Sequence, residues 1–132
     1  MIKAGLVRTI LFVLFLVCSP MAAQQAKVAS VMSKQLPDIQ GKEVQMLTVE
    51  YPPGSSDPVH RHNADAFAYV LEGSVDIGLN GGEPVTYTAG QTFYEGPNDI
   101  HTVGRNASKT QPAKFVVFLL KDKGAPVLIP VK

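Results

Sequence analysis

Apolar and polar residues alternate along several short segments after residue 43. In VQMLTVEY, residues 44–51, Leu47, Val49 and Tyr51 recur at every second position. The segment SVDIGLN, residues 74–80, repeats this alternation. Because side chains of a β-strand point alternately to two faces, this period of two predicts half-buried strands.

Proline and glycine residues separate these segments. Pro52-Pro53-Gly54 should end the first strand, because proline cannot donate to the ladder and glycine permits a turn. Asn80-Gly81-Gly82 predicts a hairpin after the second alternating segment. Further strands are predicted in a run that begins at His60 and His62 and continues through AFAYVL, and at residues 85–88, residues 91–95, around His101, and residues 114–121.

The two ends of the chain show weaker patterns. Residues 24–43 have little periodicity and are interpreted as a lead-in arm with one short strand or one turn of helix. The proline-rich tail, residues 124–132, is interpreted as an edge strand or an extended arm. Since residues 24–132 show no sustained helical period, the sequence predicts one all-β domain, a sandwich or barrel.

The first 23 residues have the pattern of a secretory signal peptide. Lys3 and Arg8 precede the apolar run of residues 10–17, and small residues lead to Met21-Ala22-Ala23. The run is shorter than the roughly 20 residues that a spanning helix needs, so an uncleaved anchor is the weaker alternative. We expect cleavage to leave a mature chain of residues 24–132, periplasmic or secreted, with no stable membrane anchor.

Composition excludes several classes of function for this mature chain. Loss of Lys3 and Arg8 leaves ten basic and eleven acidic side chains, and no basic cluster predicts nucleic-acid binding. Cys18, the one cysteine, lies in the predicted signal peptide, which excludes a disulfide framework and a thiol nucleophile. No serine lies in a Gly-x-Ser-x-Gly elbow either.

Three histidines carry the candidate chemistry. His60 and His62, two residues apart on a predicted strand, should project from the same face. Neutral imidazole nitrogens bind zinc, iron or copper at about 2.0–2.1 Å, and His101 on a later strand can supply a third ligand. The alternative is a pair of surface histidines on an edge strand.

The surrounding residues resemble the cupin family, in its small single-domain bacterial type. The first cupin motif is similar to Gly54, five residues, His60-Arg61-His62, three residues, position 66, six residues and Gly73. The second motif resembles, with slightly altered gaps, the series Gly90, Pro97, His101 and Asn106. The resemblance covers about residues 44–120 and implies a cupin-like jelly-roll barrel in which His60, His62 and His101 bind a divalent metal: Fe, Mn, Cu, Zn or Ni.

One residue departs from the family pattern. Ala66 occupies the position of the family's glutamate ligand, and a methyl group cannot coordinate a metal. The resemblance therefore implies three neutral ligands and a site that keeps the full charge of the ion. Some cupin dioxygenases have three-histidine sites of this kind, suited to bidentate anionic substrates. An empty site is the alternative.

Other acidic and amide side chains are weaker candidates for the site. Asp65 should face away from the histidines unless a bulge turns it inward. Asp99, two residues before His101, and Gln91 are candidates to support the metal ligands, although Asp99 also fits a turn. Glu72 and Glu95 each precede a glycine and are predicted to be exposed.

The parity of the strand after His62 predicts what lines each face. Ala64, Ala66 and Ala68 share the parity of the two histidines and should line a pocket with methyl groups. Phe67, Tyr69 and Leu71 take the other face, where they either pack on a second sheet or form a homodimer interface.

These observations predict an exported small cupin that binds a divalent metal, with dioxygenase-type oxidoreductase activity on a small anionic molecule. The alternative is a non-catalytic module that binds a small molecule or a metal. A metal-dependent isomerase or lyase is less well supported, because no inward-facing proton shuttle is predicted.

Overall fold

The computed structural model describes residues 24–132, so the predicted signal peptide, residues 1–23, lies outside the described residues. This part of the chain folds into strands and turns without a helix, and no segment of it meets the length and hydropathy of a membrane-spanning helix. The strands are β1 (Lys27–Gln35), β2 (Lys42–Tyr51), β3 (His60–Arg61), β4 (Ala64–Glu72), β5 (Ser74–Leu79), β6 (Val85–Thr88), β7 (Thr92–Glu95), β8 (Ile100–Asn106), β9 (Ala113–Asp122) and β10 (Ile129–Pro130).

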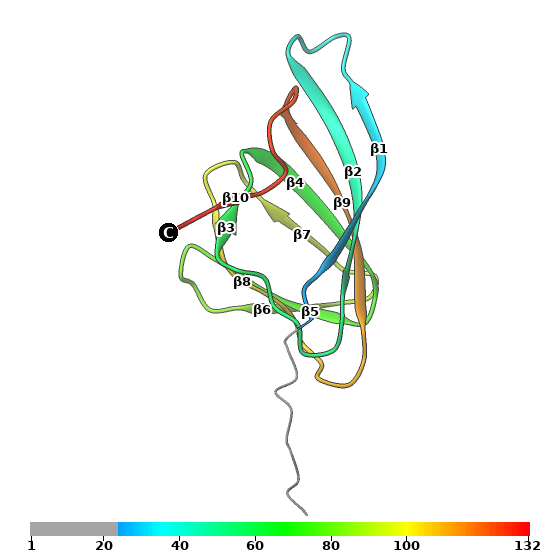
Figure 1. Cartoon of the computed structure of the whole chain (residues 1–132), viewed down its shortest axis with the longest axis vertical. Coiled ribbons are helices and arrows are strands. Elements are labelled where there is room, and N and C mark those ends of the chain that lie inside the picture. Colours follow the sequence, from blue (N-terminus) through cyan, green and yellow to red (C-terminus); the bar gives the residue numbers. More distant parts are fainter. Residues whose placement is uncertain (1–23) are drawn as a thin grey trace, which may run out of the picture.

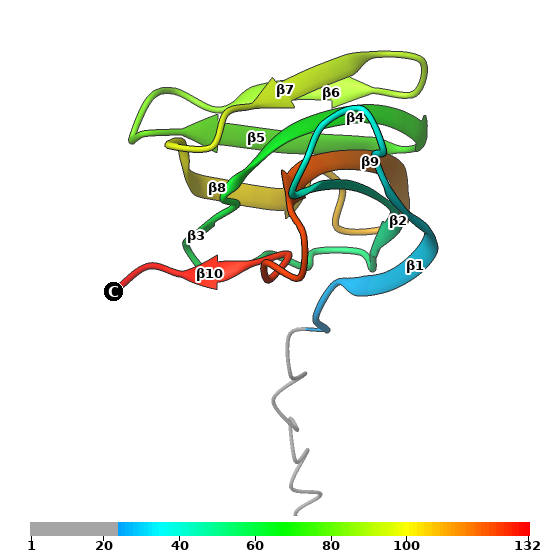
Figure 2. The ribbon, with the colours of Figure 1, turned by 90° about the horizontal axis from the view of Figure 1, so that it is seen from above.

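The strands form two five-stranded sheets whose described pairings are antiparallel. One sheet has the order β1-β2-β9-β4-β7 and the other β10-β3-β8-β5-β6. Figures 1 and 2 show the two sheets wrapping around a shared interior, with β10 beside β3 at one edge. This arrangement confirms the predicted all-β, jelly-roll architecture.

The core lies between the sheets and follows the alternation read from the sequence. In β2, Leu47, Val49 and Tyr51 are buried while Thr48 and Glu50 between them are partly exposed. In β5, Val75 and Ile77 are buried in the same way. The core is completed by side chains from β4, β7 and β9: Ala64, Ala66, Ala68, Val70, Phe93, Ala113, Phe115, Val117 and Leu119.

The N-terminal arm differs from the expectation of one short strand or helical turn. Residues 27–35 form the nine-residue strand β1, paired with β2 in antiparallel register and interrupted by a bulge between Ser30 and Met32. Every residue of β1 is exposed, and β1 is the edge strand of its sheet. An exposed strand needs no apolar alternation, which explains the weak signal in its sequence.

The strand predicted to run unbroken from His60 through AFAYVL is divided in two. β3 pairs with β8 in one sheet, whereas β4 pairs with β9 and β7 in the other. The chain changes sheets at His62-Asn63, where the ladder is interrupted. This crossing brings the two histidines to the wall of the cavity between the sheets rather than along one flat strand.

The outer face of β4 is not covered by another sheet in the described chain. Phe67, Tyr69 and Leu71 are exposed there, so packing against a second sheet is excluded within residues 24–132. Tyr94 of β7 and Phe118 of β9 are exposed as well, and the rings of Phe67 and Tyr94 lie 5.1 Å apart between centroids, tilted by 48°. We call these five residues the outer apolar face.

Candidate metal centre

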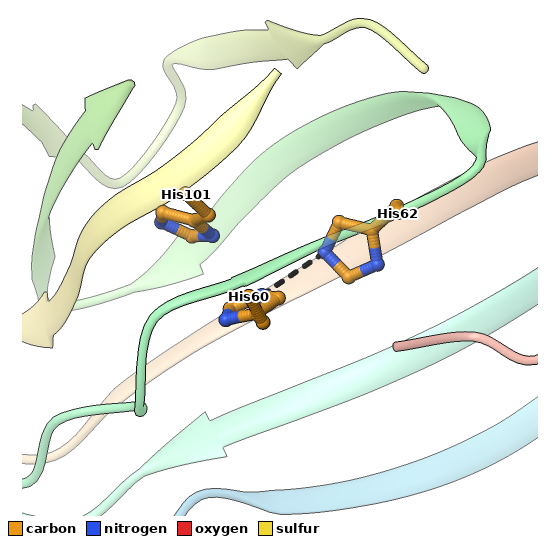
Figure 3. A group of neighbouring side chains, drawn as sticks. All are labelled: His60, His62 and His101. Atoms are coloured by element: carbon orange, nitrogen blue, oxygen red, sulfur yellow. Dashed lines mark hydrogen bonds between the residues drawn. The ribbon is translucent and has the colours of Figure 1, made fainter. Parts of the chain in front are cut away.

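The three histidines come together at the end of the cavity between the sheets. His60 of β3 is paired in register with His101 of β8, and His62 follows where the chain leaves β3. One ligand atom from each of the three imidazoles lies within 4.8 Å of the other two. Figure 3 shows the three rings gathered in one place, His101 from β8 and the other two from the segment around β3. The three histidines could therefore hold a metal ion.

Backbone carbonyl groups determine which nitrogen of His60 and of His62 carries the proton. His60 Nδ1 lies 2.8 Å from the carbonyl oxygen of Pro58, and His62 Nδ1 contacts the carbonyl oxygen of Val127. A carbonyl oxygen can only accept a hydrogen bond, so each Nδ1 is the donor. In the neutral rings each Nε2 then presents a lone pair, as in imidazoles that bind metals.

The spacing of these lone pairs suits a shared cation. His60 Nε2 and His62 Nε2 are 3.2 Å apart (dashed line in Figure 3). Metal–nitrogen bonds of about 2.0–2.1 Å at neighbouring positions separate two ligand nitrogens by roughly 2.8–3.4 Å. Two lone pairs at this distance repel each other unless a cation or a proton lies between them. The donor set therefore fits a divalent metal.

His101 has no hydrogen-bond partner among the described residues for either ring nitrogen, although it is only 5% exposed. Burial lowers the pKa of His101 to about 4, and the neighbouring His60 and His62 contribute to the decrease. Burial also lowers the pKa of His62. Both rings are thus neutral near pH 7 and able to donate a lone pair to a metal.

Gly104 leaves the space that the ring of His101 occupies. A Cβ atom at this position would lie 2.8 Å from His101 Nε2 and 3.2 Å from the hydroxyl oxygen of Tyr51. The first separation is shorter than any ordinary contact, so a side chain here would displace the imidazole. The small residue on β8 therefore positions the third histidine.

The prediction that Glu95 is exposed is wrong. It is 5% exposed, and its Oε2 and Oε1 atoms lie 3.5 Å from His62 Nε2 and His101 Nδ1, respectively. The sequence contained a signal for this position. In β7, Phe93 and Glu95 are buried while Thr92 and Tyr94 are exposed, so Glu95 shares the parity of an aromatic core residue. Glu72, predicted to be exposed in the same way, is exposed.

The contacts between Glu95 and the histidines are not ion pairs in the metal-free protein near pH 7. Burial raises the pKa of Glu95 to about 7, and the negative charges of Asp99 and Asp57 add to the increase. The same burial keeps His62 and His101 uncharged. A carboxyl group and three imidazoles thus share one desolvated end of the cavity.

The cavity itself has a volume of about 290 Å³ and is mostly apolar. Its polar groups are the three histidines, Glu95, and Tyr51 with Asp57, whose carboxylate accepts a hydrogen bond from the tyrosine hydroxyl. No lysine or arginine lines it within residues 24–132. The remaining walls come from both sheets and from the C-terminal tail: Val28, Leu47, Val49, Ala66, Phe93, Phe115, Val117, Val127 and Leu128.

The three alanines predicted to line the pocket are all buried, but they differ in what they contact. Ala66 lines the cavity beside the histidines. Ala64 and Ala68 belong to the apolar core. Ala66 thus contributes a methyl group to the cavity wall, while aromatic and branched side chains form most of the remaining wall.

The polar candidates Gln91 and Asp99 lie in turns and do not contact the histidines. The Gln91 side-chain oxygen accepts a hydrogen bond from the backbone N–H of Thr88. Asp99 accepts hydrogen bonds from the Gly96 N–H and the Asn80 amide. Neither side chain supports the metal ligands directly, because each makes its hydrogen bonds within or beside its own turn. Asp65 faces away from the histidines, as predicted, and accepts a hydrogen bond from Tyr94.

Comparison with protein families identifies the class of this fold. The cupin domain family matches residues 47–119, more than half of the chain. The chain belongs to the cupin family. No curated protein sequence is significantly similar to it.

Solved structures of low sequence identity have the same fold. A Klebsiella pneumoniae protein with a double-stranded β-helix domain superposes with a TM-score of 0.65 at 15% identity, covering 83% of this chain and 89% of that one. The DMSP lyase DddQ from Ruegeria pomeroyi gives 0.58 at 18% identity, over 67% and 43%. An oxalate oxidase in complex with the substrate analogue glycolate gives 0.57 at 27% identity, over 67% and 46%. This chain thus spans less than half the length of the last two proteins.

Proposed function

We propose that this protein binds a divalent metal through His60, His62 and His101 and acts as a dioxygenase-type oxidoreductase on a small organic anion. The observation that carries the proposal is the 3.2 Å contact between His60 Nε2 and His62 Nε2, two atoms that each present a lone pair. Carbonyl groups hold both rings in this orientation, and the unpartnered ring of His101 lies beside them.

A redox-active divalent ion held here would supply Lewis acidity and the ability to react with dioxygen. In a dioxygenase reaction both oxygen atoms enter the substrate, so no external reductant is required. The chain's own residues orient the metal ligands and exclude water, since aromatic and branched side chains form most of the cavity wall. They thereby confine the reaction to one desolvated end of the cavity.

The lining of the cavity indicates a substrate class. Because no lysine or arginine lines the described cavity, the charge of an anionic substrate has to be balanced by the metal. A carboxylate or enolate head would bind the ion, and an apolar body would lie against Phe93, Phe115 and Val117. The oxalate oxidase with bound glycolate supports testing small carboxylates. The apolar wall favours 2-oxo and 2-hydroxy acids with apolar side chains over oxalate itself.

Export forms part of this proposal. The pattern of residues 1–23 supports removal of a signal peptide, which would leave the domain in the periplasm or outside the cell. The intact mass of protein purified from an exporting bacterial host tests this. A mass that corresponds to a chain beginning near residue 24 supports export. A mass that corresponds to the chain with residues 1–23 argues against it.

The metal site is tested by elemental analysis of untagged mature protein and of its His101→Ala variant. We expect near-stoichiometric metal in the wild type and loss of most of it in the variant, since one of three strong ligands is removed. Circular dichroism should show an unchanged β-sheet signal. A wild type that stays metal-free after separate additions of Fe, Mn, Cu, Zn and Ni would contradict the proposed site.

Oxygen consumption separates the catalytic function from the binding alternative. The metal-loaded protein is mixed with a panel of 2-oxo and 2-hydroxy acids, with glycolate and oxalate included. Substrate-dependent uptake that disappears in His101→Ala supports the oxidoreductase. Tight metal and ligand binding with no uptake would instead support a non-catalytic binding module, in agreement with the largely apolar cavity.

A further inference from the structure

Glu95 and Ala66 lie directly opposite each other on neighbouring strands. They are register partners in the antiparallel pair of β4 and β7. Opposed residues of such a pair point to the same face, with Cβ atoms about 4.5–5.5 Å apart. A glutamate at either position therefore extends into the same part of the cavity. The methyl group of Ala66 leaves room for the longer side chain of Glu95.

The carboxylate of Glu95 faces two of the three histidines. Its two oxygens are 3.5 Å from one nitrogen of His62 and one of His101. Among residues 24–132 the structure gives this carboxylate no hydrogen bond, and the buried Lys121 donates instead to Glu43 and to the carbonyl of Ala125. A buried carboxylate needs a hydrogen-bond donor or a cation to be stabilised, and the nearest polar atoms that the structure gives this one are the two imidazole nitrogens.

We propose that Glu95, if the site binds a metal as proposed above, is the fourth ligand and replaces from β7 the carboxylate that position 66 lacks on β4. The site then has three neutral ligands and one negative ligand. A divalent ion keeps a single net positive charge in this environment. Such a site suits a substrate with one negative charge, whereas a dianion would meet the opposing charge of Glu95.

The ligand role is tested by titrating the mature protein with Co²⁺ alone and following the visible absorption of the bound ion. We expect Glu95→Gln to weaken binding at least about tenfold and to change the absorption spectrum, because a charged ligand is replaced by an amide of the same shape. Glu72→Gln is the matched control. Glu72 is also a strand-end glutamate before a glycine, but it is exposed, and its removal should leave affinity and spectrum unchanged.

Exchanging the residues at positions 66 and 95 tests whether a carboxylate from either position can reach the metal. The double variant Ala66→Glu/Glu95→Ala returns the glutamate to β4 and the methyl group to β7. We expect it to bind Co²⁺ more tightly than Glu95→Ala and to within about tenfold of the wild type. Ala66→Glu alone should not tighten binding, because it forces two acidic side chains into one space.

The outcomes separate this inference from the proposed function. A wild type that binds neither Co²⁺ nor any of Fe, Mn, Cu, Zn and Ni overturns both. A wild type that binds Co²⁺ and loses it in His101→Ala, while Glu95→Gln binds with the same affinity and spectrum, keeps the three-histidine site and overturns the role of Glu95. If Glu95→Gln does not fold, the double variant Ala66→Glu/Glu95→Ala decides. Co²⁺ binding by this double variant that is no tighter than by Glu95→Ala overturns the inference. Binding that recovers to near the wild-type affinity supports it.

Discussion

Among the residues of the site, Ala66 and Glu95 show that a carboxylate can reach the same place in the cavity from either of two paired strands. In a paired sheet, the functional unit is the place reached by a side chain, and two opposed residues reach the same place. A substitution in one strand can then be balanced by a residue on the next strand. Comparing motifs along the chain misses this exchange, because residues 66 and 95 are far apart in sequence.

The buried state of Glu95 predicts a pH dependence for the metal-free protein. Its pKa is about 7 in the folded protein against an ordinary value of 4.5. Between these values the folded chain binds a proton that the unfolded chain releases. The stabilising contribution is therefore fully present below pH 4.5 and is lost as the pH rises through 7, a change on the order of 3 kcal/mol.

Urea unfolding of the wild type and Glu95→Gln in the presence of a chelator measures this contribution. The free energy of unfolding of the wild type, relative to that of the variant, should be higher at pH 5 than at pH 8. The lowered pKa of His101 has the opposite effect, with stability lost as the pH falls from 6.5 towards 4. This effect of His101 is present in both the wild type and Glu95→Gln, so it largely cancels in the difference between their free energies of unfolding. A difference that is independent of pH would show that Glu95 is ionised in the folded protein.

Among the elements, the C-terminal tail contributes to the candidate site although it carries none of its histidines. Val127 accepts the hydrogen bond from His62 Nδ1, and β10 then pairs with β3 through Ile129 and Pro130. The tail thus holds one ligand ring in place, and Val127 and Leu128 form part of the cavity wall.

Two truncations separate these roles of the tail. A chain that ends at Pro126 loses the carbonyl partner of His62, whereas a chain that ends at Leu128 keeps it and loses only β10. We expect the shorter chain to bind Co²⁺ about 10- to 100-fold more weakly than the wild type, as when a group that orients a metal ligand is removed. The longer chain should lose much less. Equal affinities in the two truncated chains would contradict the role of the Val127 carbonyl.

Strands with one buried face show the clearest signal in the sequence, whereas β6, which has no buried residue, is predicted from its β-branched and aromatic residues and the turns beside it. β2 and β5 show their alternation because one side of each contacts the core. β1 is exposed on both sides, so its sequence carries no such period. The break between β3 and β4 was missed because parity continues across it from His62 to Ala64. The change of sheet depends on which distant strands are available for pairing, and local sequence does not encode that.

For the whole molecule, the outer apolar face predicts association. Its five large side chains (Phe67, Tyr69, Leu71, Tyr94 and Phe118) lie on three neighbouring strands of one sheet and are exposed. A contiguous apolar patch of this kind is typical of a protein interface, and a second copy offers the same patch in a two-fold arrangement. We therefore expect a homodimer through this face.

Size-exclusion chromatography with light scattering checks the dimer. The wild type should elute with the mass of two chains and Phe67→Glu with the mass of one, because a charge would be buried at the centre of the contact. Val85→Glu is the control, since Val85 is an equally exposed apolar residue on β6 of the other sheet. A monomeric wild type, or a Phe67→Glu variant that remains dimeric, would exclude this interface.

The candidate site could be predicted in part, for reasons that differ between residues. The spacing of His60 and His62 and the position of His101 indicated the cluster that the fold assembles. Glu95 could have been found from the parity of its strand. The carbonyl of Val127 could not, because every residue carries a carbonyl and only the pairing of β10 with β3 brings this one to His62.

The place of β9 and the tail in the fold has a consequence for when the site can form. β9 lies between β2 and β4 and supplies Phe115 and Val117 to the cavity, and the partner of His62 comes later still. A chain still emerging from the ribosome, or still crossing a membrane, lacks these parts and cannot complete the site. If the protein crosses the membrane as an unfolded chain and binds a metal, as proposed, it would acquire that metal after translocation. The ion it carries would then reflect the supply in that compartment as much as the preference of its ligands.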